Sequence, residues 1–373
     1  MKGIKIGKVL GFEISIDWSW LLIFLLVTFS LARGYFPRLY PSFSAAMDWW
    51  LGVLASLLLF VAVVIHELSH SVIARRYGTE VKGITLFVFG GVSQTSDEPK
   101  SPTEEFWMAL VGPLASIVLA GFFYGLRIAG LGFLWPLPLI ALLTYLAWVN
   151  FVLGIFNLIP GFPLDGGRVL RSIIWAVTNN LKKATLWASY VGQGFGYLLI
   201  AGGLFIFFSG TIISGLWAIF VGWFLAGTAR SSYQQLMVRE ALSGVPVNRV
   251  MTTDVAPIPA DMSVRQFVDE FLLRHDYACY PVVNGDDVMG VIGAEEVRTI
   301  RANMWEATSV GSIAHRIDSA YKISPEDDAW NALIKLASEE VCRLVVMENN
   351  HLKGTVGRDS LYRLVNAKLH IGS

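Results

Sequence analysis

The chain has 373 residues with 29 basic and 29 acidic side chains, so its formal net charge at pH 7 is zero. That balance gives no support for nucleic-acid binding, and a hydrophobic content of 54% is unusual for a soluble globular protein. The apolar residues are concentrated before Arg230, and the charged residues are denser after it. The sequence therefore predicts a membrane domain over residues 1–230, a linker over 231–244 and a soluble domain over 245–373.

The N-terminus has some features of a cleavable signal peptide. Lysines within the first eight residues precede an apolar run from Trp18, and Ser30-Leu31-Ala32 is similar to a cleavage site. However, Glu13 and Asp17 interrupt the region, and the isoleucines before Trp18 alternate as they do in short strands. We therefore expect a retained first membrane helix.

Spanning helices need about 20 mostly apolar residues. Six segments are candidates: 18–32, 48–74, 104–128, 133–158, 186–208 and 211–229. With the N-terminus inside, the inner side holds twelve basic residues: Lys2, Lys5, Lys8, Arg75, Arg76, Lys82, Lys100, Arg168, Arg171, Lys182, Lys183 and Arg230. The outer side holds three, Arg33, Arg38 and Arg127. Because basic residues favour the cytoplasmic side, we predict a multi-pass protein of the cell membrane with both termini in the cytoplasm.

The second candidate span contains His66-Glu67-Leu68-Ser69-His70 after seventeen uncharged residues, 49–65. Two imidazoles four residues apart lie on one helix face and can bind one Zn²⁺, while the glutamate between them can act as general base. Ionisable groups inside a membrane are costly and usually functional. Arg75 follows His66 after roughly 14 Å of helix, so the predicted metal lies below the inner surface. The alternative is a chance match whose side chains only pair with one another.

A catalytic zinc site needs a third protein ligand. The fourth candidate span ends in Asn157-Leu158-Ile159-Pro160-Gly161-Phe162-Pro163-Leu164-Asp165-Gly166-Gly167, which predicts a helix break near the inner face. Asp165 is the candidate carboxylate ligand; alternatively, it caps a helix that begins near Arg168. Asn157 either donates to the oxyanion of a tetrahedral intermediate or bonds a neighbouring helix.

HELSH in a candidate membrane helix, followed by FNLIPGFPLDGG, resembles the site-2 protease family of intramembrane zinc metalloproteases over about residues 1–230. Gly112-Pro113-Leu114-Ala115-Ser116 is similar to that family's G-P-L-x-N motif, with Ser in place of Asn. The resemblance implies His66, His70 and Asp165 as ligands of one Zn²⁺ per chain. It also implies Glu67 as general base and an oxyanion role for Asn157. Ser69 stands where family members commonly carry Gly, a departure that bears on local helix packing.

Residues 81–92 predict one or two strands that end in Gly90-Gly91. A peptide bond inside a helix is shielded by its own turn, so an exposed edge strand beside the metal could accept an extended substrate by β-addition. Alternatively, the strand only packs under the helices. The resemblance implies a small membrane-embedded sheet near the site.

The soluble tail contains an internal repeat. Tyr280-Pro281-Val282-Val283 corresponds to Leu344-Val345-Val346 at an offset of 63, which also superposes Cys279 on Cys342. Gly290-Val291-Ile292-Gly293 matches Gly354-Thr355-Val356-Gly357 at an offset of 64. The repeat predicts a duplicated α/β unit of about 60 residues. We expect the two cysteines to be reduced, buried side chains of a cytosolic domain and not a disulfide.

This repeat resembles a tandem pair of CBS domains, at about 245–303 and 304–367, opening with Val250-Met251-Thr252. Many such pairs bind adenosine nucleotides through a Thr and an Asp after the glycine turn. Here Gly293 and Gly357 replace the Thr, whereas Glu296 and Ser360 replace the Asp. Glu296 is thus the remaining candidate for bonding a ribose hydroxyl. The pair either senses a ligand such as an adenosine nucleotide or is a structural module, for example one that forms a homodimer.

These observations predict a multi-pass α-helical membrane domain of about six spans with a small sheet near the site, plus a cytosolic α/β tandem CBS domain. The predicted activity is zinc-dependent hydrolysis of a peptide bond within or near a transmembrane segment of a membrane protein, modulated by the CBS pair. One alternative is a zinc transporter or sensor, although transporters usually have broken helices in matching halves and only one break is predicted here. The other is an inactive membrane scaffold.

Overall fold

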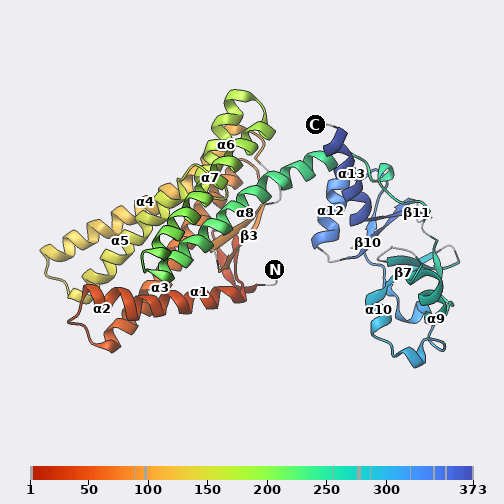
Figure 1. Cartoon of the computed structure of the whole chain (residues 1–373), viewed down its shortest axis with the longest axis horizontal. Helices are drawn as coiled ribbons and strands as arrows, with labels where there is room; N and C mark the ends of the chain where they lie inside the picture. Colours follow the sequence, from red (N-terminus) through yellow and green to blue (C-terminus); the bar gives the residue numbers. More distant parts are fainter. Residues whose placement is uncertain are drawn as a thin grey trace. The chain divides into compact units, whose positions relative to one another are not determined.

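The computed structural model describes residues 3–88, 90–95, 99–254, 256–274, 279–285, 287–319, 321–338, 341–348 and 351–371. The chain divides into two compact units, Met1–Gln234 and Gln235–Ser373. Figure 1 shows that the first unit is mainly long helices and the second is a mixture of strands and short helices. Helix α8 (Ile212–Leu242) passes from one unit into the next, so most of the segment expected as a linker is helical.

Six helical segments in the described part of the chain are long and apolar enough to cross a membrane, as many as the sequence predicts. The first combines α1 (Trp18–Ser30), a π-helical turn (Leu31–Tyr35) and α2 (Phe36–Leu39). The others are α3 (Ala45–Arg76), α4 (Pro102–Gly132), α5 (Leu137–Asn157), α7 (Leu181–Phe208) and α8. The shorter α6 (Asp165–Thr178) lies between α5 and α7 in the chain.

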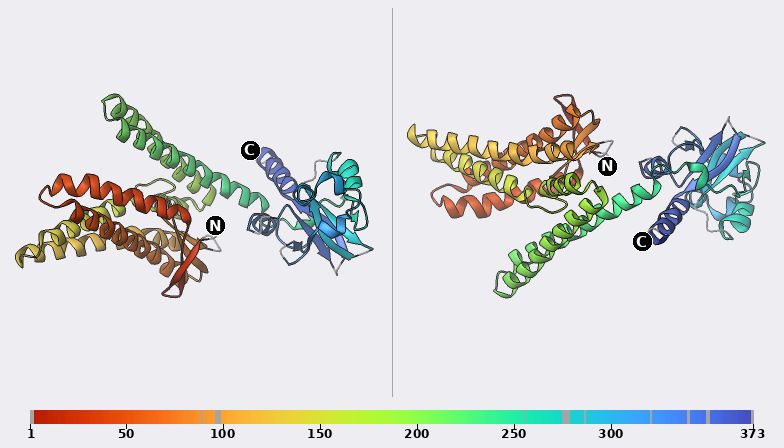
Figure 2. Two further views of the ribbon diagram at one scale, coloured as in Figure 1. Left: turned by 90° about the horizontal axis from the view of Figure 1, so that it is seen from below. Right: turned by 90° about the horizontal axis from the view of Figure 1, so that it is seen from above.

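Capping side chains and small residues explain where these helices begin and how closely they pack. Ser44 and Ser101 each accept a hydrogen bond from the backbone N–H three residues ahead, which satisfies a donor that the first turn leaves free. Helices α4 and α5 run side by side in Figures 1 and 2. A Cβ added at Gly203 of α7 would clash with Ile219 and with the Gly215 carbonyl of α8, so the missing side chain lets these two helices approach closely.

A four-stranded sheet with the order β1-β2-β3-β4 belongs to the first unit. Strands β1 (Ile4–Val9) and β2 (Phe12–Ile16) form an antiparallel hairpin, β2 runs parallel to β3 (Val81–Phe87), and β3 pairs antiparallel with β4 (Gly90–Thr95). The strands expected before Trp18 are therefore confirmed. Residues 81–92 contribute to two strands. The second strand begins at Gly90, whereas the prediction placed the end of the strands at Gly90-Gly91. Phe12 and Ile84 pack on Leu68 of α3, so the sheet covers the turn of α3 that carries the histidines.

The second unit contains the duplicated α/β arrangement predicted from the repeat. One sheet has the order β5 (Ile258–Pro259), β6 (Cys279–Asn284), β7 (Asp287–Gly293) and β8 (His315–Arg316); the other has β11 (His351–Gly357), β10 (Arg343–Glu348) and β9 (Lys322–Ile323). The helices are α9 (Val264–Phe267), α10 (Ala294–Arg298), α11 (Val310–Ile313), α12 (Ala329–Ser338) and α13 (Arg358–Ile371). Each half has its own core, with Phe267 and Tyr280 in the first and Leu336 and Leu344 in the second.

The expectation of two reduced cysteines is wrong, because a disulfide joins Cys279 to Cys342. Cys279 opens β6 and Cys342 immediately precedes β10, and these strands contact one another, with the two Cα atoms 6.2 Å apart. The antiparallel registers pair Cys279 with Gly293 and Arg343 with Gly357, so the strands repeat at an offset of 64. Cys342 therefore lies one residue before the position equivalent to Cys279. Sequence spacing gave no sign that the beginnings of β6 and β10 adjoin.

Candidate metal centre

His66 and His70 lie one turn apart near the C-terminal end of α3, and both are buried. A spacing of four residues directs both side chains to the same side of the helix. The ring centroids are 4.8 Å apart and the Nε2 atoms 3.2 Å apart. The two imidazoles therefore present their nitrogens to one common point.

Asp165 completes this arrangement from a distant part of the chain. After α5 ends at Asn157, the chain turns and α6 begins at Asp165. Gly161 within the turn meets the backbone of Gly192 in α7, where a Cβ would not fit. Asp165 Oδ2 lies 3.1 Å from His66 Nε2 and 3.2 Å from His70 Nε2. The N-cap residue of α6 is Leu164, so the Asp165 carboxylate faces the histidines and does not cap the helix.

The three donor atoms fit a zinc ion. They form a nearly equilateral triangle with edges of 3.1, 3.2 and 3.2 Å. In a tetrahedral site with Zn–N and Zn–O bonds of 2.0–2.1 Å, neighbouring ligand atoms are roughly 3.3 Å apart. Two imidazole nitrogens and one carboxylate oxygen are common zinc ligands, and three protein ligands leave the fourth position open. The donor set therefore suits a catalytic zinc better than a structural one.

Helix α4 orients both histidines. His70 Nδ1 donates to the carbonyl oxygen of Met108 at 2.5 Å, and His66 Nδ1 lies 2.9 Å from Ser116 Oγ. Because a carbonyl oxygen only accepts, Nδ1 of His70 carries the proton and its Nε2 keeps a lone pair for a metal. Between these contacts lies Gly112, where a Cβ would overlap the Nε2 atoms of both histidines. The Gly112–Ser116 motif thus leaves space for the donor atoms at one end and holds an imidazole at the other.

Glu67 lies between the sheet and the donor atoms. Ser93 Oγ donates to Glu67 Oε2 at 3.1 Å, and Gly91 packs so closely on the Glu67 side chain that a Cβ there would clash. Both contacts come from strand β4, at the edge of the sheet. The candidate base is therefore held against an edge strand, the kind of strand to which an extended peptide could add.

One cavity of about 800 Å³ contains these groups. His66, Glu67, His70 and Asp165 line it together with residues of β4, and apolar side chains of α1 and α8 form further walls: Leu22, Ile23, Leu26, Trp217, Phe220, Val221, Phe224 and Leu225. Asn157 also lines this cavity, and its Nδ2 donates to the Leu153 carbonyl at 3.0 Å. One amide N–H is thereby used, and the other is left for a second acceptor.

A buried ion pair behind the site escaped the sequence analysis. Glu105 of α4 is fully buried and accepts a hydrogen bond from Arg171 Nε of α6 at 2.6 Å; Arg171 Nη2 also contacts the same oxygen. Arg168 Nε lies 4.0 Å from it. The pair fixes α6, which begins at Asp165, against α4, which holds both histidines. The only sign of this pair in the sequence is that Glu105 lies near the start of an apolar helix and Arg171 lies within an amphipathic one.

In the second unit, Glu296 and Ser360, at the positions where many CBS pairs carry the nucleotide-binding Asp, serve local structure. Glu296 Oε2 accepts from the backbone N–H of Gly293 at 2.8 Å and so caps α10. The equivalent Ser360 is buried, and its Oγ accepts from the Gly357 N–H at 3.3 Å. Ser69, the departure within the HELSH motif, donates to the Ile65 carbonyl at 2.8 Å on the exposed side of α3.

Membrane-length helices around a buried pair of histidines and an aspartate, with a glutamate in the same cavity, define a membrane-embedded metallopeptidase. A Peptidase family M50 model matches residues 54–136 and 126–201, and a CBS domain model matches residues 247–303. The chain is 35% identical to sll0528 of Synechocystis sp., named as a zinc metalloprotease, over 92% of this chain and 90% of that one. It is 33% identical to Rip3 of Mycobacterium tuberculosis, named in the same way, over 97% and 93% of the two chains. The chain therefore belongs to peptidase family M50, the site-2 proteases, and is a zinc metallopeptidase.

Among solved structures, the chain is similar to the site-2 protease from Methanocaldococcus jannaschii. The two are 30% identical in sequence, the match covers 62% of this chain and 95% of that one, and the TM-score is 0.42.

Proposed function

We propose that this metallopeptidase hydrolyses a peptide bond within or near a transmembrane segment of another membrane protein. The observation that carries the proposal is where the donor set lies. His66 and His70 belong to a helix of membrane-spanning length, and the cavity they share with Asp165 is walled by apolar side chains of α1 and α8. A transmembrane segment can approach such a cavity from the lipid, whereas a water-soluble chain would have to leave water first.

The proposed chemistry assigns each polar group in the cavity a task. His66, His70 and Asp165 hold one Zn²⁺, which when bound lowers the pKa of a water and polarises the scissile carbonyl. Glu67, steadied by Ser93, takes the proton of the attacking water and passes it to the leaving amine. The second N–H of the Asn157 amide donates to the oxyanion.

Substrate is proposed to bind as an extended strand along β4. This strand has β3 as its one neighbour in the described sheet, and residues 90–93 line the cavity beside Glu67. In an extended chain, alternate N–H groups face the template strand. The amides on either side of the scissile bond thus fall into two alternating sets, one facing β4 and one facing away. N-methylation of amides in the set that faces β4 should therefore slow cleavage, whereas N-methylation in the other set should have little effect. Equal effects in both sets would argue against strand addition.

We further propose that the protein is a multi-pass protein of the cell membrane with both termini in the cytoplasm. The excess of basic residues in the loops assigned to the inner side supports this orientation. Accessibility of single cysteines introduced near Lys8 and Trp135, measured in cells with and without membrane permeabilisation, tests it. Labelling of a cysteine near Lys8 in intact cells would show that the N-terminus lies outside, which would contradict the proposed topology.

The CBS pair is proposed to modulate cleavage, either by sensing an adenosine nucleotide or by forming a homodimer. The family match over residues 247–303 supports a CBS role. Glu296 remains the candidate contact to a ribose, although its carboxylate also caps α10. Calorimetry with ATP and AMP, cleavage with and without nucleotide, and the mass of the purified particle separate these alternatives. Absent binding, unchanged cleavage and a monomeric mass would together remove the regulatory proposal.

The experiment that tests the proposed function compares wild type with Glu67→Gln in proteoliposomes containing single-span substrates. Zinc content should stay near one per chain in both, because Glu67 is not a proposed ligand. Cleavage should fall by at least about 100-fold, the usual contribution of a positioned general base. Glu80→Gln is the matched control, since Glu80 is an exposed carboxylate beyond the end of α3. It should keep both zinc and activity.

The same experiment distinguishes the rival functions. A zinc carrier would move zinc equally well with Glu67→Gln and would show no proteolysis. An inactive scaffold would show no cleavage in the wild type with any substrate of the panel. Either result would overturn the proposed peptidase activity at this site.

A further inference from the structure

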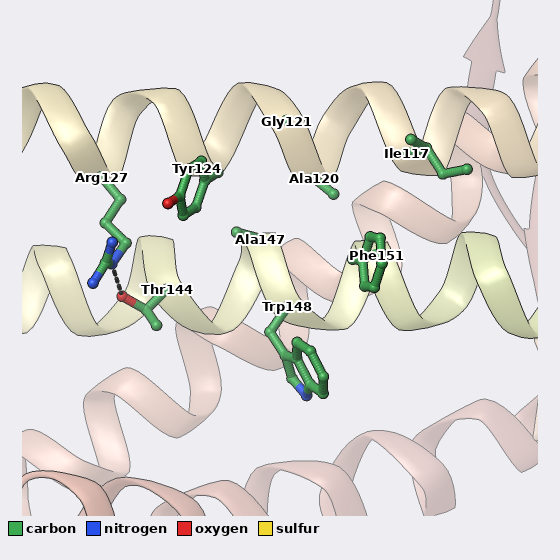
Figure 3. Close-up of a pocket in the computed structure, with 9 residues that line it drawn as sticks. All are labelled: Ile117, Ala120, Gly121, Tyr124, Arg127, Thr144, Ala147, Trp148 and Phe151. Carbon is green, nitrogen blue, oxygen red and sulfur yellow. Dashed lines mark hydrogen bonds between the residues drawn. The ribbon is translucent and has the colours of Figure 1, made fainter.

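A groove of about 630 Å³ runs between α4 and α5, away from the metal centre. Figure 3 shows the side chains along it, from Arg127 and Thr144 at one end to Ile117 and Phe151 at the other. Ala120 and Ala147 are buried in its floor, while Trp148 and Phe151 are 60% and 46% exposed at its edge. The groove is therefore apolar and open to the surface of the helix pair.

Arg127 is the only charged residue between positions 106 and 157. Its Nε donates to Thr144 Oγ1 at 3.0 Å, and the Thr144 hydroxyl in turn donates to the Ile140 carbonyl at 2.7 Å. The guanidinium also lies 5.8 Å from the ring centre of Tyr124. No carboxylate of the described residues pairs with it. The side chain is thus oriented by Nε, and both Nη groups are left for an external acceptor.

The position of Arg127 along the membrane explains which acceptor that is. Arg127 lies five residues before the end of α4, which places it roughly 8 Å from the helix end. An arginine at this depth lowers its cost by reaching the interface or a lipid headgroup. Guanidinium binds phosphate through two parallel hydrogen bonds, and two free Nη groups supply those donors.

The length of the groove matches one leaflet. From Arg127 to Ile117 there are ten residues of α4, or about 15 Å. The hydrocarbon core is about 30 Å thick, so a lipid tail that starts at the interface extends over about half of that thickness. The apolar part of the groove thus begins where a lipid phosphate would meet Arg127 and continues as far as an acyl chain would reach.

We propose that this groove binds one anionic phospholipid, with its phosphate on Arg127 and one acyl chain between α4 and α5. The site is separate from the peptidase cavity, because no described residue lines both, and the phosphate end at Arg127 lies about 22 Å along α4 from Gly112. A net negative headgroup is the chemistry favoured by an arginine without a carboxylate partner. Phosphatidylglycerol is the probe, and phosphatidylethanolamine, which carries the same phosphate but no net charge, is the comparison.

Native mass spectrometry of the full-length protein, released from nanodiscs that contain both lipids, measures the bound ratio. The wild type should retain one phosphatidylglycerol in clear preference. Arg127→Gln should lower that preference by roughly tenfold, the effect of losing a charged hydrogen-bonded partner. Arg33→Gln is the matched control, because Arg33 is another arginine of the predicted outer side that lies against Trp49 instead of this groove. It should retain the lipid.

A second pair of variants tests the apolar part. Gly121 lines the groove and has open space where a Cβ would be added, so Gly121→Phe should fill the groove and displace the lipid. Gly125 on the same helix has equal space but does not line the groove, so Gly125→Phe should change nothing. If Arg127→Gln loses zinc or aggregates, Arg127→Lys takes its place; it keeps the charge but not the paired Nη donors, so it should keep the preference for phosphatidylglycerol only in part.

Several results would overturn the proposal. These are equal retention of the two lipids by the wild type, unchanged retention by both Arg127→Gln and Gly121→Phe, or loss of lipid with the Arg33 and Gly125 controls. Disulfide-linked dimers of a Trp148→Cys variant in membranes would show that a second copy of the chain occupies the groove instead.

Discussion

Removal of the cation that faces Glu105 should be among the most destabilising single changes near the metal centre. Glu105 is fully buried, Arg171 is 9% exposed, and the second carboxylate oxygen of Glu105 has no hydrogen-bond partner among the described residues. Arg171→Met would leave a buried carboxylate with only the more distant Arg168, at 4.0 Å. Breaking a buried pair by removing one partner costs about 3–5 kcal/mol. We expect the lower end, because Arg168 remains.

The double variant Glu105→Leu/Arg171→Met supplies the critical comparison. Apolar replacement of both partners is often neutral, since no charge is left without compensation. Unfolding free energies of the wild type, both single variants and the double variant in detergent form a double-mutant cycle. We expect a coupling energy of at least about 2 kcal/mol. A coupling energy below about 0.5 kcal/mol would refute the argument that this pair joins α4 to α6.

The pair should also affect metal binding, because α6 carries Asp165 at its first residue. Zinc affinity measured by chelator competition should fall by roughly tenfold in Arg171→Met, as it does when groups that orient ligands are removed. Cleavage by Arg171→Met should be closer to the wild-type rate at saturating zinc than at limiting zinc. Arg265→Met is a control of the same chemistry, since Arg265 forms an exposed pair with Asp269 in the second unit. It should leave zinc affinity unchanged.

Three further predictions concern the metal centre. Gly112→Ala should abolish zinc binding, because the added Cβ would overlap the donor nitrogens of both histidines. Gly121→Ala on the same helix should keep zinc, since nothing lies where its Cβ would be added. The zinc content of the two purified proteins tests this prediction. Ser116→Ala should weaken zinc binding by 10- to 100-fold through loss of the partner of His66 Nδ1, measured by competition with a chelator of known affinity. Exhaustive chelation should stop cleavage and lower the unfolding free energy by about 2.7 kcal/mol relative to protein with zinc at 100 times its dissociation constant; equal stability with and without zinc would contradict a native metal site.

The sequence was sufficient for the parts of the fold that depend on local pattern. Runs of about 20 apolar residues indicate spans regardless of how the helices pack. The four-residue spacing of His66 and His70 places them on one helix face in any tertiary arrangement. Asp165 needed more than spacing: the helix break made it a candidate and the family resemblance made it the predicted ligand, while an N-cap role remained open until the position of α6 was known.

Other parts depend on contacts that leave little trace in sequence. Met108 acts through its backbone carbonyl, which every residue possesses, so no side-chain pattern could reveal its bond to His70. Glu105 and Arg171 are 66 residues apart and meet only because α6 packs on α4. The disulfide was missed for a related reason. Whether Cys279 and Cys342 meet depends on how the two halves of the second unit pack, which the repeat alone does not specify.

The candidate metal centre shows why a membrane helix with so few polar groups can still specify one geometry. Helix α4 meets the site with three residues at a spacing of four, Met108, Gly112 and Ser116, which therefore lie on one face of the helix. The outer two hold the Nδ1 atoms of His70 and His66, and the middle one has no side chain where the two Nε2 atoms converge. A residue larger than glycine in the middle would fill the position of the donor atoms, and loss of the outer bonds would free the rings to rotate. The same helix face thus determines both the space at the metal site and the direction of the donor nitrogens.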